Sequence, residues 1–197
     1  MKKLFELHQK ITFVGNEYRV LKDRAAGPKL AGYAKQKRLA IREKFTLFSD
    51  DAQTEIIAQS QARSIMDFGA TYDVLDNQGK PLAVVKKQFK KSIISSTWTI
   101  SKPISNKLLF TVYEKSLPIA IARRLWNFIP FIGEFLPFPL RFHFTVSDAN
   151  GKIVGEYEKI TIVRDHYALH LDEKAIPKLD KRAWMITTVL LDALQSR

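Results

Sequence analysis

The stretch that most constrains the fold is residues 183–191, because all nine of them are apolar or threonine. Asp180 stands just before this run and is a good N-cap residue, able to accept the free N–H groups of a first helical turn. A helix with no polar face must be surrounded on all sides, by protein or by lipid. Spanning a bilayer takes about 20 apolar residues, and Asp192 ends this run. We therefore predict a core helix that the rest of the chain encloses.

Most of the remaining chain repeats a pattern of short alternating runs joined by turns. The clearest unit covers residues 71–85, and the unit at 144–154 matches it in register, with Asp148 and Gly151 in the places of Asp76 and Gly79. Alternating runs around an Asp, Asn or Gly turn are typical of β-hairpins. Weaker copies give six units in total, which open on the aromatic residues Tyr18, Phe45, Tyr72, Trp98, Phe144 and Tyr167.

Six hairpin-like units predict about twelve strands, which is more than an open twisted sheet usually holds. Closing the sheet into a barrel removes its exposed edges. A barrel of that size is too wide to be filled by its own side chains, and the apolar helix supplies the filling. We therefore expect a mainly β (α+β) fold, a closed barrel of about twelve strands around a central hydrophobic C-terminal helix. We expect residues 1–197 to form a single domain.

An insertion at residues 117–140 lengthens the spacing between the fourth and fifth units and holds four of the eight prolines. These prolines interrupt it too often for a spanning helix, although a short helix over 119–128 fits. Aromatic residues beside arginines are typical of segments at a membrane interface. On that interpretation the membrane contacts are Trp126, Phe128, Phe131 and Phe135. The alternative is a loop that folds over one end of the barrel and buries its aromatic side chains against protein.

Positive charge is concentrated in two parts of the chain. The net charge is +12. Residues 1–48 carry twelve Lys or Arg against four acidic residues, and residues 80–124 carry ten against one. Such a local excess favours an anionic partner, either phospholipid or nucleic acid. A soluble protein with a high pI and no such partner remains the alternative.

The lysines of residues 86–91 are the first candidates for binding phosphate. On a strand they point to both faces, and an apolar interior does not accept bare ammonium groups. This run must therefore bend, bulge or lie at the end of the barrel, where it either grips phosphates or forms an ordinary solvated edge. The predicted phosphate-binding residues are Lys86, Lys87, Lys90, Lys91, Arg123 and Arg124.

The usual catalytic and cofactor motifs are missing from the sequence. His166 and His170 fall on one face of a strand about 13 Å apart, too far to share a metal ion. We expect no catalytic residue, no metal and no cofactor. The chain has no cysteine, which fits a reducing compartment. The N-terminus is basic, but Glu6 and His8 interrupt what would be the apolar core of a signal peptide, so none is expected. The predicted location is the cytoplasm, at the inner face of the membrane.

Four stretches resemble the tubby C-terminal-like superfamily, in particular its LURP-one-related and small bacterial members, which are relatives of phospholipid scramblases. These stretches are residues 37–50, 70–79, 91–98 and 190–197. The resemblance implies a twelve-stranded barrel around a hydrophobic helix and a non-enzymatic activity. Tubby itself binds phosphoinositide head groups through basic residues on its barrel. The acylated cysteines and calcium segment of the scramblases have no counterpart in this chain.

The sequence thus favours a non-enzymatic binding module that engages anionic phospholipid at a membrane surface through a basic barrel face. Binding of nucleic acid or of an acidic protein through the same face is the alternative, as is a purely structural role. Nucleic acid is less favoured because the aromatic residues, apart from Phe89, fall where core strands need them and not among the lysines.

Overall fold

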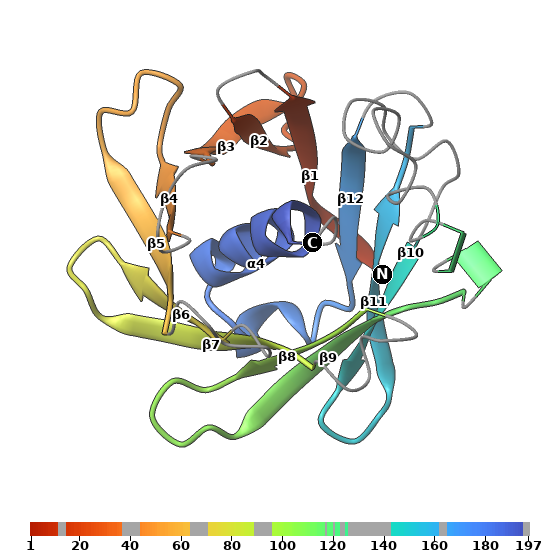
Figure 1. The fold of residues 1–197 in the computed structure, drawn as a ribbon. Helices are drawn as coiled ribbons and strands as arrows, with labels where there is room; N and C mark the ends of the chain where they lie inside the picture. Colours follow the sequence, from red (N-terminus) through yellow and green to blue (C-terminus); the bar gives the residue numbers. More distant parts are fainter. Residues whose placement is uncertain are drawn as a thin grey trace.

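The structure is a computed structural model that describes residues 1–11, 15–36, 44–63, 71–88, 96–116, 118–119, 121–122, 125, 143–161 and 165–194. Within these residues, twelve antiparallel strands form one closed barrel, and helix α4 lies inside it (Figure 1). The strands are β1 Lys2–Ile11, β2 Asn16–Lys22, β3 Lys29–Lys35, β4 Lys44–Phe48, β5 Ile56–Ala62, β6 Thr71–Asp76, β7 Pro81–Lys87, β8 Thr97–Ser101, β9 Leu108–Glu114, β10 His143–Asp148, β11 Ile153–Lys159 and β12 His166–Leu171. The predicted fold class is confirmed.

Neighbouring strands follow the order of the chain, and the barrel closes where β1 pairs with β12. Residues 2–11, whose basic start resembles a leader, form this closing strand. The signal for a strand is the alternation in its middle, where Phe5 and Leu7 are buried while Glu6 and His8 are partly exposed. In the closing pair, Leu7 lies opposite Tyr167.

The two predicted hairpins with matching turns are confirmed as β6–β7 and β10–β11. Asp76 Oδ1 accepts hydrogen bonds from the backbone N–H groups two and four residues further on, and Asp148 Oδ1 does the same. Gly79 and Gly151 have φ of 81° and 80°, in the left-handed region that favours glycine. The same side-chain chemistry therefore builds the same turn twice.

Helix α4 spans Lys181–Ala193 and follows the 3-10 helix η1 at Ile176–Lys178. The Asp180 carboxylate accepts a hydrogen bond of 2.8 Å from the backbone N–H of Arg182, which confirms the predicted N-cap. Thr187 and Thr188 donate their hydroxyl hydrogens to carbonyls in the preceding turn of the same helix, so these polar groups need no partner in the barrel wall. No helix in the described part of the chain has the length and apolarity needed to cross a membrane.

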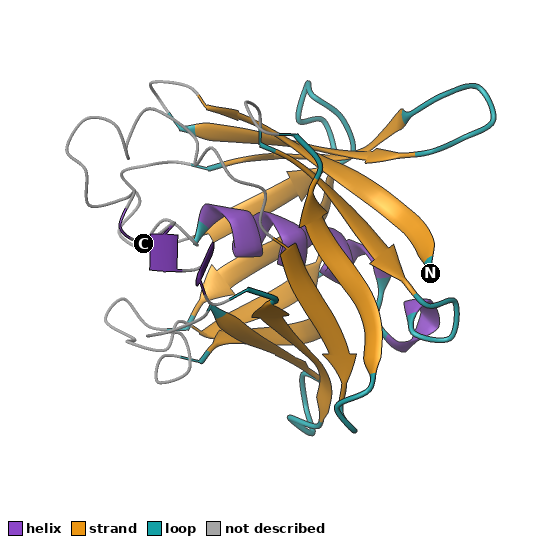
Figure 2. Cartoon of the chain, turned by 90° about the vertical axis from the view of Figure 1, so that its right-hand side faces the viewer, coloured by secondary structure: helices purple, strands orange, loops and turns teal. Residues whose placement is uncertain are grey.

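Helix α4 runs from one end of the barrel to the other (Figure 2). It begins near the β6–β7 turn, where Arg182 Nη1 lies 4.0 Å from Asp76 Oδ2. It ends beside the last residue of β7, because Lys87 Nζ donates a 2.9 Å hydrogen bond to the Leu194 carbonyl. The even-numbered strands therefore begin at the end of the barrel where α4 stops. The six aromatic residues that open the predicted units are the second or third residues of these strands, and each is at most 2% exposed.

A polar cluster interrupts the apolar interior beside the last turn of α4. Burial, reinforced by the negative charge of Asp192, raises the pKa of Tyr18, Tyr157 and Tyr167 well above the ordinary value of 10. The hydroxyl of Tyr167 is hydrogen-bonded to Asp192. These phenols sit around a carboxylate near the C-terminus of a helix, where the helix dipole disfavours negative charge.

Alkaline pH is expected to unfold the protein. Burial also raises the pKa of Tyr72 to about 12, so four phenols keep their protons in the folded chain at pH values where the unfolded chain releases them. Their contribution to stability is complete below pH 10 and is lost as the pH rises toward 12, by up to about 1.4 kcal/mol per pH unit for each tyrosine. Tyrosinate absorbance and far-UV circular dichroism should change together in this range. Tyr157→Phe removes one such phenol and should make the loss shallower; ionisation of these four phenols at the ordinary pH in a folded barrel would contradict this.

Candidate functional site

Charge is distributed unequally between the two ends of the barrel. We call the end where α4 stops the basic end; its strand-to-strand connections are residues 12–15, 36–43, 63–70, 88–96, 115–142 and 160–165. These connections carry eleven Lys or Arg against four Asp or Glu. The segments that leave strands at the opposite end, including the one between β12 and α4, carry seven of each. The positive charge seen in the sequence is therefore concentrated at one end of the barrel axis.

Several described side chains at the basic end point into solvent. Lys10, Lys44 and Lys86 are exposed. Arg63 and Lys115 are also exposed, but each pairs with a carboxylate on another strand, at 2.7 Å to Asp73 of β6 and 3.0 Å to Glu156 of β11. Exposed pairs of this kind are weak, so both cations can exchange their partners for another anion at small cost.

The structure separates the neighbouring lysines Lys86 and Lys87. Strand β7 ends at Lys87, at the end of the barrel, as an interior closed to ammonium groups requires. Lys86 points outward and is exposed. Lys87 turns inward, where Nζ meets the Leu194 carbonyl at the end of α4 and lies 5.5 Å from the centre of the Trp98 ring. Lys87 therefore serves the helix C-terminus, where a positive charge is favoured.

The remaining predicted site residues lie outside the described residues, so their predicted roles stay predictions. They are Lys90, Lys91, Arg123, Arg124, Trp126, Phe128, Phe131 and Phe135. The first two belong to the connection between β7 and β8, and the others belong to the connection between β9 and β10. Both connections join strand ends at the basic end.

The insertion begins with a helical turn that has two apolar sides. Ile119 and Ala122 are partly buried and pack against the barrel core. Ile121 and Leu125 belong to the same turn and are 49% and 63% exposed. The sequence prediction chose later aromatic residues and missed this exposed pair. The four-residue spacing of Ile121 and Leu125, which places both on one helix face, is the signal that identifies it.

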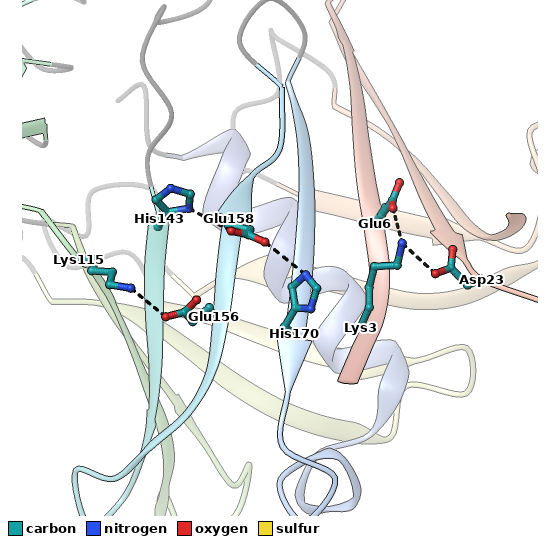
Figure 3. A network of polar contacts seen from close by, with 8 residues as sticks. All are labelled: Lys3, Glu6, Asp23, Lys115, His143, Glu156, Glu158 and His170. Atoms are coloured by element: carbon teal, nitrogen blue, oxygen red, sulfur yellow. Dashed lines mark hydrogen bonds and ion pairs between the residues drawn. The ribbon is translucent and has the colours of Figure 1, made fainter. Parts of the chain in front are cut away.

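All four histidines lie on the outer face of β1, β10 and β12, away from α4. Figure 3 shows His143 and His170 on either side of Glu158, with ring nitrogens 3.5 and 3.4 Å from its carboxylate oxygens. His8 and His166 stack on each other with ring centroids 3.8 Å apart. In the part of the chain that the structure describes, no three His, Asp or Glu residues are placed to hold a metal ion. The histidines therefore serve contacts between strands.

The acidic residues in turns also have structural partners. Asp50 accepts a hydrogen bond from the Thr54 backbone N–H, and Asp148 holds the β10–β11 turn as described above. Asp51 receives two hydrogen bonds from the Arg19 guanidinium, at 3.1 and 3.0 Å. Asp50, Asp51 and Asp148 therefore serve backbone turns and an ion pair with Arg19.

The different positions of Lys86 and Lys87 lead to a stability prediction. Lys87→Met keeps the apolar stem but removes the charge at the end of α4, and should lower the free energy of unfolding by about 1–2 kcal/mol. Lys86→Met makes the same chemical change at an exposed position and should stay within about 0.5 kcal/mol of the unmodified protein. Urea unfolding followed by circular dichroism measures both. Equal effects of the two substitutions would contradict a capping role for Lys87.

Comparison with known proteins identifies the family. A family model described as LURP-one-related matches residues 30–192, which is most of the chain and includes nine complete strands, most of β3 and the greater part of α4. No curated protein matches the chain. Membership is compatible with a non-enzymatic binding module. The chain therefore belongs to the LURP-one-related family, within the tubby-like C-terminal superfamily, as this match, the closed twelve-stranded barrel and the enclosed C-terminal helix together establish.

Proposed function

We propose that the chain is a non-enzymatic binding module that meets anionic phospholipid head groups at a membrane surface through its basic end. The observation that carries this proposal is the excess of eleven basic over four acidic residues in the connections at one end of the barrel. A lysine or arginine near an anionic membrane surface contributes about 1 kcal/mol. A net excess of this size is therefore enough to hold a small domain at the membrane.

Helix α4 supports a role for the outer surface. Trp184, Ile186 and Leu190 lie along this helix and are at most 1% exposed. The helix therefore fills the interior space that a barrel of this size would otherwise leave for a ligand. A partner therefore meets the rim of the barrel and not its axis. Lipid head groups suit such a rim, because a membrane presents its phosphates as a broad plane and needs no deep cleft.

The insertion favours lipid over nucleic acid. Ile121 and Leu125 present aliphatic side chains to solvent at the basic end. Single-stranded nucleic acid is bound by aromatic stacking on bases, whereas an aliphatic pair beside arginines suits the boundary between head groups and acyl chains. The predicted lipid contacts Trp126, Phe128, Phe131 and Phe135 follow the same pair in the chain. On this proposal the protein is peripheral and works at the cytoplasmic face, where anionic lipid is concentrated.

Co-sedimentation with vesicles tests the electrostatic part of the proposal. Binding to vesicles of phosphatidylcholine and phosphatidylserine should exceed binding to phosphatidylcholine alone, and should weaken as salt screens the charges. The triple variant Lys86→Gln/Lys90→Gln/Lys91→Gln, which leaves Lys87 on its helix, should weaken the binding at least tenfold. The control Lys2→Gln/Lys22→Gln/Lys29→Gln removes the same charge from exposed lysines at the opposite end and should change the binding much less. Equal losses in the two variants, or binding that does not depend on lipid charge and salt, argue against a site at the basic end.

A short single-stranded oligonucleotide added as competitor tests the nucleic-acid alternative.

Tryptophan fluorescence tests the part played by the insertion. Trp98 and Trp184 are at most 1% exposed, so a change of emission on adding vesicles reports mainly on Trp126. We expect a blue shift with phosphatidylserine vesicles that disappears in Trp126→Phe. Leu125→Ser should reduce the shift if the exposed side of the helical turn enters the membrane interface. An emission spectrum that anionic vesicles leave unchanged would instead support an insertion folded against the barrel.

A further inference from the structure

The end of the barrel opposite the basic end has no net charge, but its basic and acidic residues are distributed unequally between two halves of the rim. The three adjacent turns β6–β7, β8–β9 and β10–β11 are residues 77–80, 102–107 and 149–152; they contain four lysines and no acidic residue. The other segments at this end contain all seven of its acidic residues and three of its seven basic ones. We call the first half, together with Ile153 at the start of β11, the turn surface. Its exposed residues include Lys80, Lys102, Ile104, Lys107, Lys152 and Ile153.

An apolar side chain projects from the centre of the turn surface. Ile104 is 90% exposed, the largest exposed fraction among the bulky apolar residues that the structure describes. It lies between Lys102 and Lys107 in the β8–β9 turn, whose ends are tied by a 2.9 Å hydrogen bond from the Lys102 N–H to the Lys107 carbonyl. Ile153, beside the neighbouring β10–β11 turn, is 50% exposed. Single exposed apolar residues are common on protein surfaces, but here two stand on neighbouring hairpins among four lysines.

The carboxylates that begin two of these three turns are already occupied. Asp76 and Asp148 stand at the starts of the β6–β7 and β10–β11 turns, and each binds two backbone N–H groups. Asp76 is in addition 8% exposed and lies near Arg182. None of the four lysines forms an ion pair with a residue that the structure describes, so their charges are available to an outside anion.

We propose that the turn surface is a second contact for anionic phospholipid membranes, with Ile104 entering the interface while the flanking lysines bind head groups. A protruding aliphatic side chain encircled by lysines is complementary to an anionic bilayer, which offers apolar depth below a layer of negative charge. Since the turn surface and the basic end lie at opposite ends of the barrel axis, the two together join two bilayers. The bridging part of this inference rests on the proposed function, whereas the contact at Ile104 does not.

A tryptophan placed at Ile104 tests the contact directly. In the background Trp126→Phe, the variant Ile104→Trp carries one exposed tryptophan beside the buried Trp98 and Trp184. Its emission should shift to the blue with phosphatidylserine vesicles and stay unchanged with phosphatidylcholine alone. The same shift should persist when Lys86, Lys90 and Lys91 are also replaced by Gln, because the turn surface acts independently of the basic end. An emission that does not respond to phosphatidylserine vesicles overturns the proposal.

Vesicle clustering tests the bridge. The unmodified protein should cluster phosphatidylserine vesicles, seen as a rise in turbidity and in particle size by light scattering. The variant Ile104→Ser/Lys102→Gln/Lys107→Gln should still co-sediment with vesicles through the basic end but lose the clustering. The control Lys22→Gln/Lys29→Gln removes two exposed lysines from the same end of the barrel and should retain it. Clustering that survives the loss of Ile104, Lys102 and Lys107 overturns the bridge.

The two experiments keep this inference distinct from the proposed function. If replacing Lys86, Lys90 and Lys91 leaves vesicle binding unchanged while the emission of Ile104→Trp still shifts, the proposed site at the basic end is wrong and the contact at the turn surface is supported. If the replacement weakens binding and the emission of Ile104→Trp does not shift, the site at the basic end is supported and the contact at the turn surface is wrong.

Discussion

The structure depends on the need to enclose a helix that has no polar side. Residues 183–191 place apolar atoms around the whole circumference of α4, and a barrel wall is the arrangement that covers every side with hydrogen-bonded backbone. The helix ends make a second demand, because the last carbonyl groups of a helix lack partners within it. Lys87 answers this demand from the wall at the Leu194 carbonyl, while Tyr167 binds the carboxylate of Asp192 in the last turn. The polar groups inside the barrel thus gather where α4 stops.

The sequence predicted the apolar helix and the features that repeat, and it missed features that neither apolarity nor repetition marks. The hairpins at Asp76 and Asp148 could be found because one turn chemistry appears twice, and the opening aromatics because they recur at nearly equal spacing. The strand β1 was hidden, since it has no turn before it and a basic start. The inward turn of Lys87 was equally beyond prediction: it depends on how far β7 extends along the barrel relative to the end of α4, which is a tertiary relation. The separation of charge at the end opposite the basic end was also beyond prediction, because it depends on the strand order that places the lysine-bearing turns side by side.

The ends of the barrel differ because their connections do different work. At the end opposite the basic end, the carboxylates of Asp76 and Asp148 accept hydrogen bonds from the backbone of their own turns. These carboxylates therefore leave the nearby lysines without an ion-pair partner among the residues that the structure describes. At the basic end, the connections are longer and carry most of the excess charge. Several outward charges along the barrel wall are already paired, such as Lys115 with Glu156 and Lys3 with Glu6 and Asp23 (Figure 3). A charged partner is therefore directed to the ends of the molecule and away from its sides.

The closure between β1 and β12 sets the order in which this domain is made. Strand β1 can pair with β12 only after residues 166–171 have been synthesised. Helix α4, which fills the barrel, follows later still, at residues 181–193. Until then the inward side chains of all twelve strands lack the helix around which they pack. Translation therefore has to proceed through α4 before a native core can form, and the emerging chain depends during synthesis on protection of its strands from association with other chains.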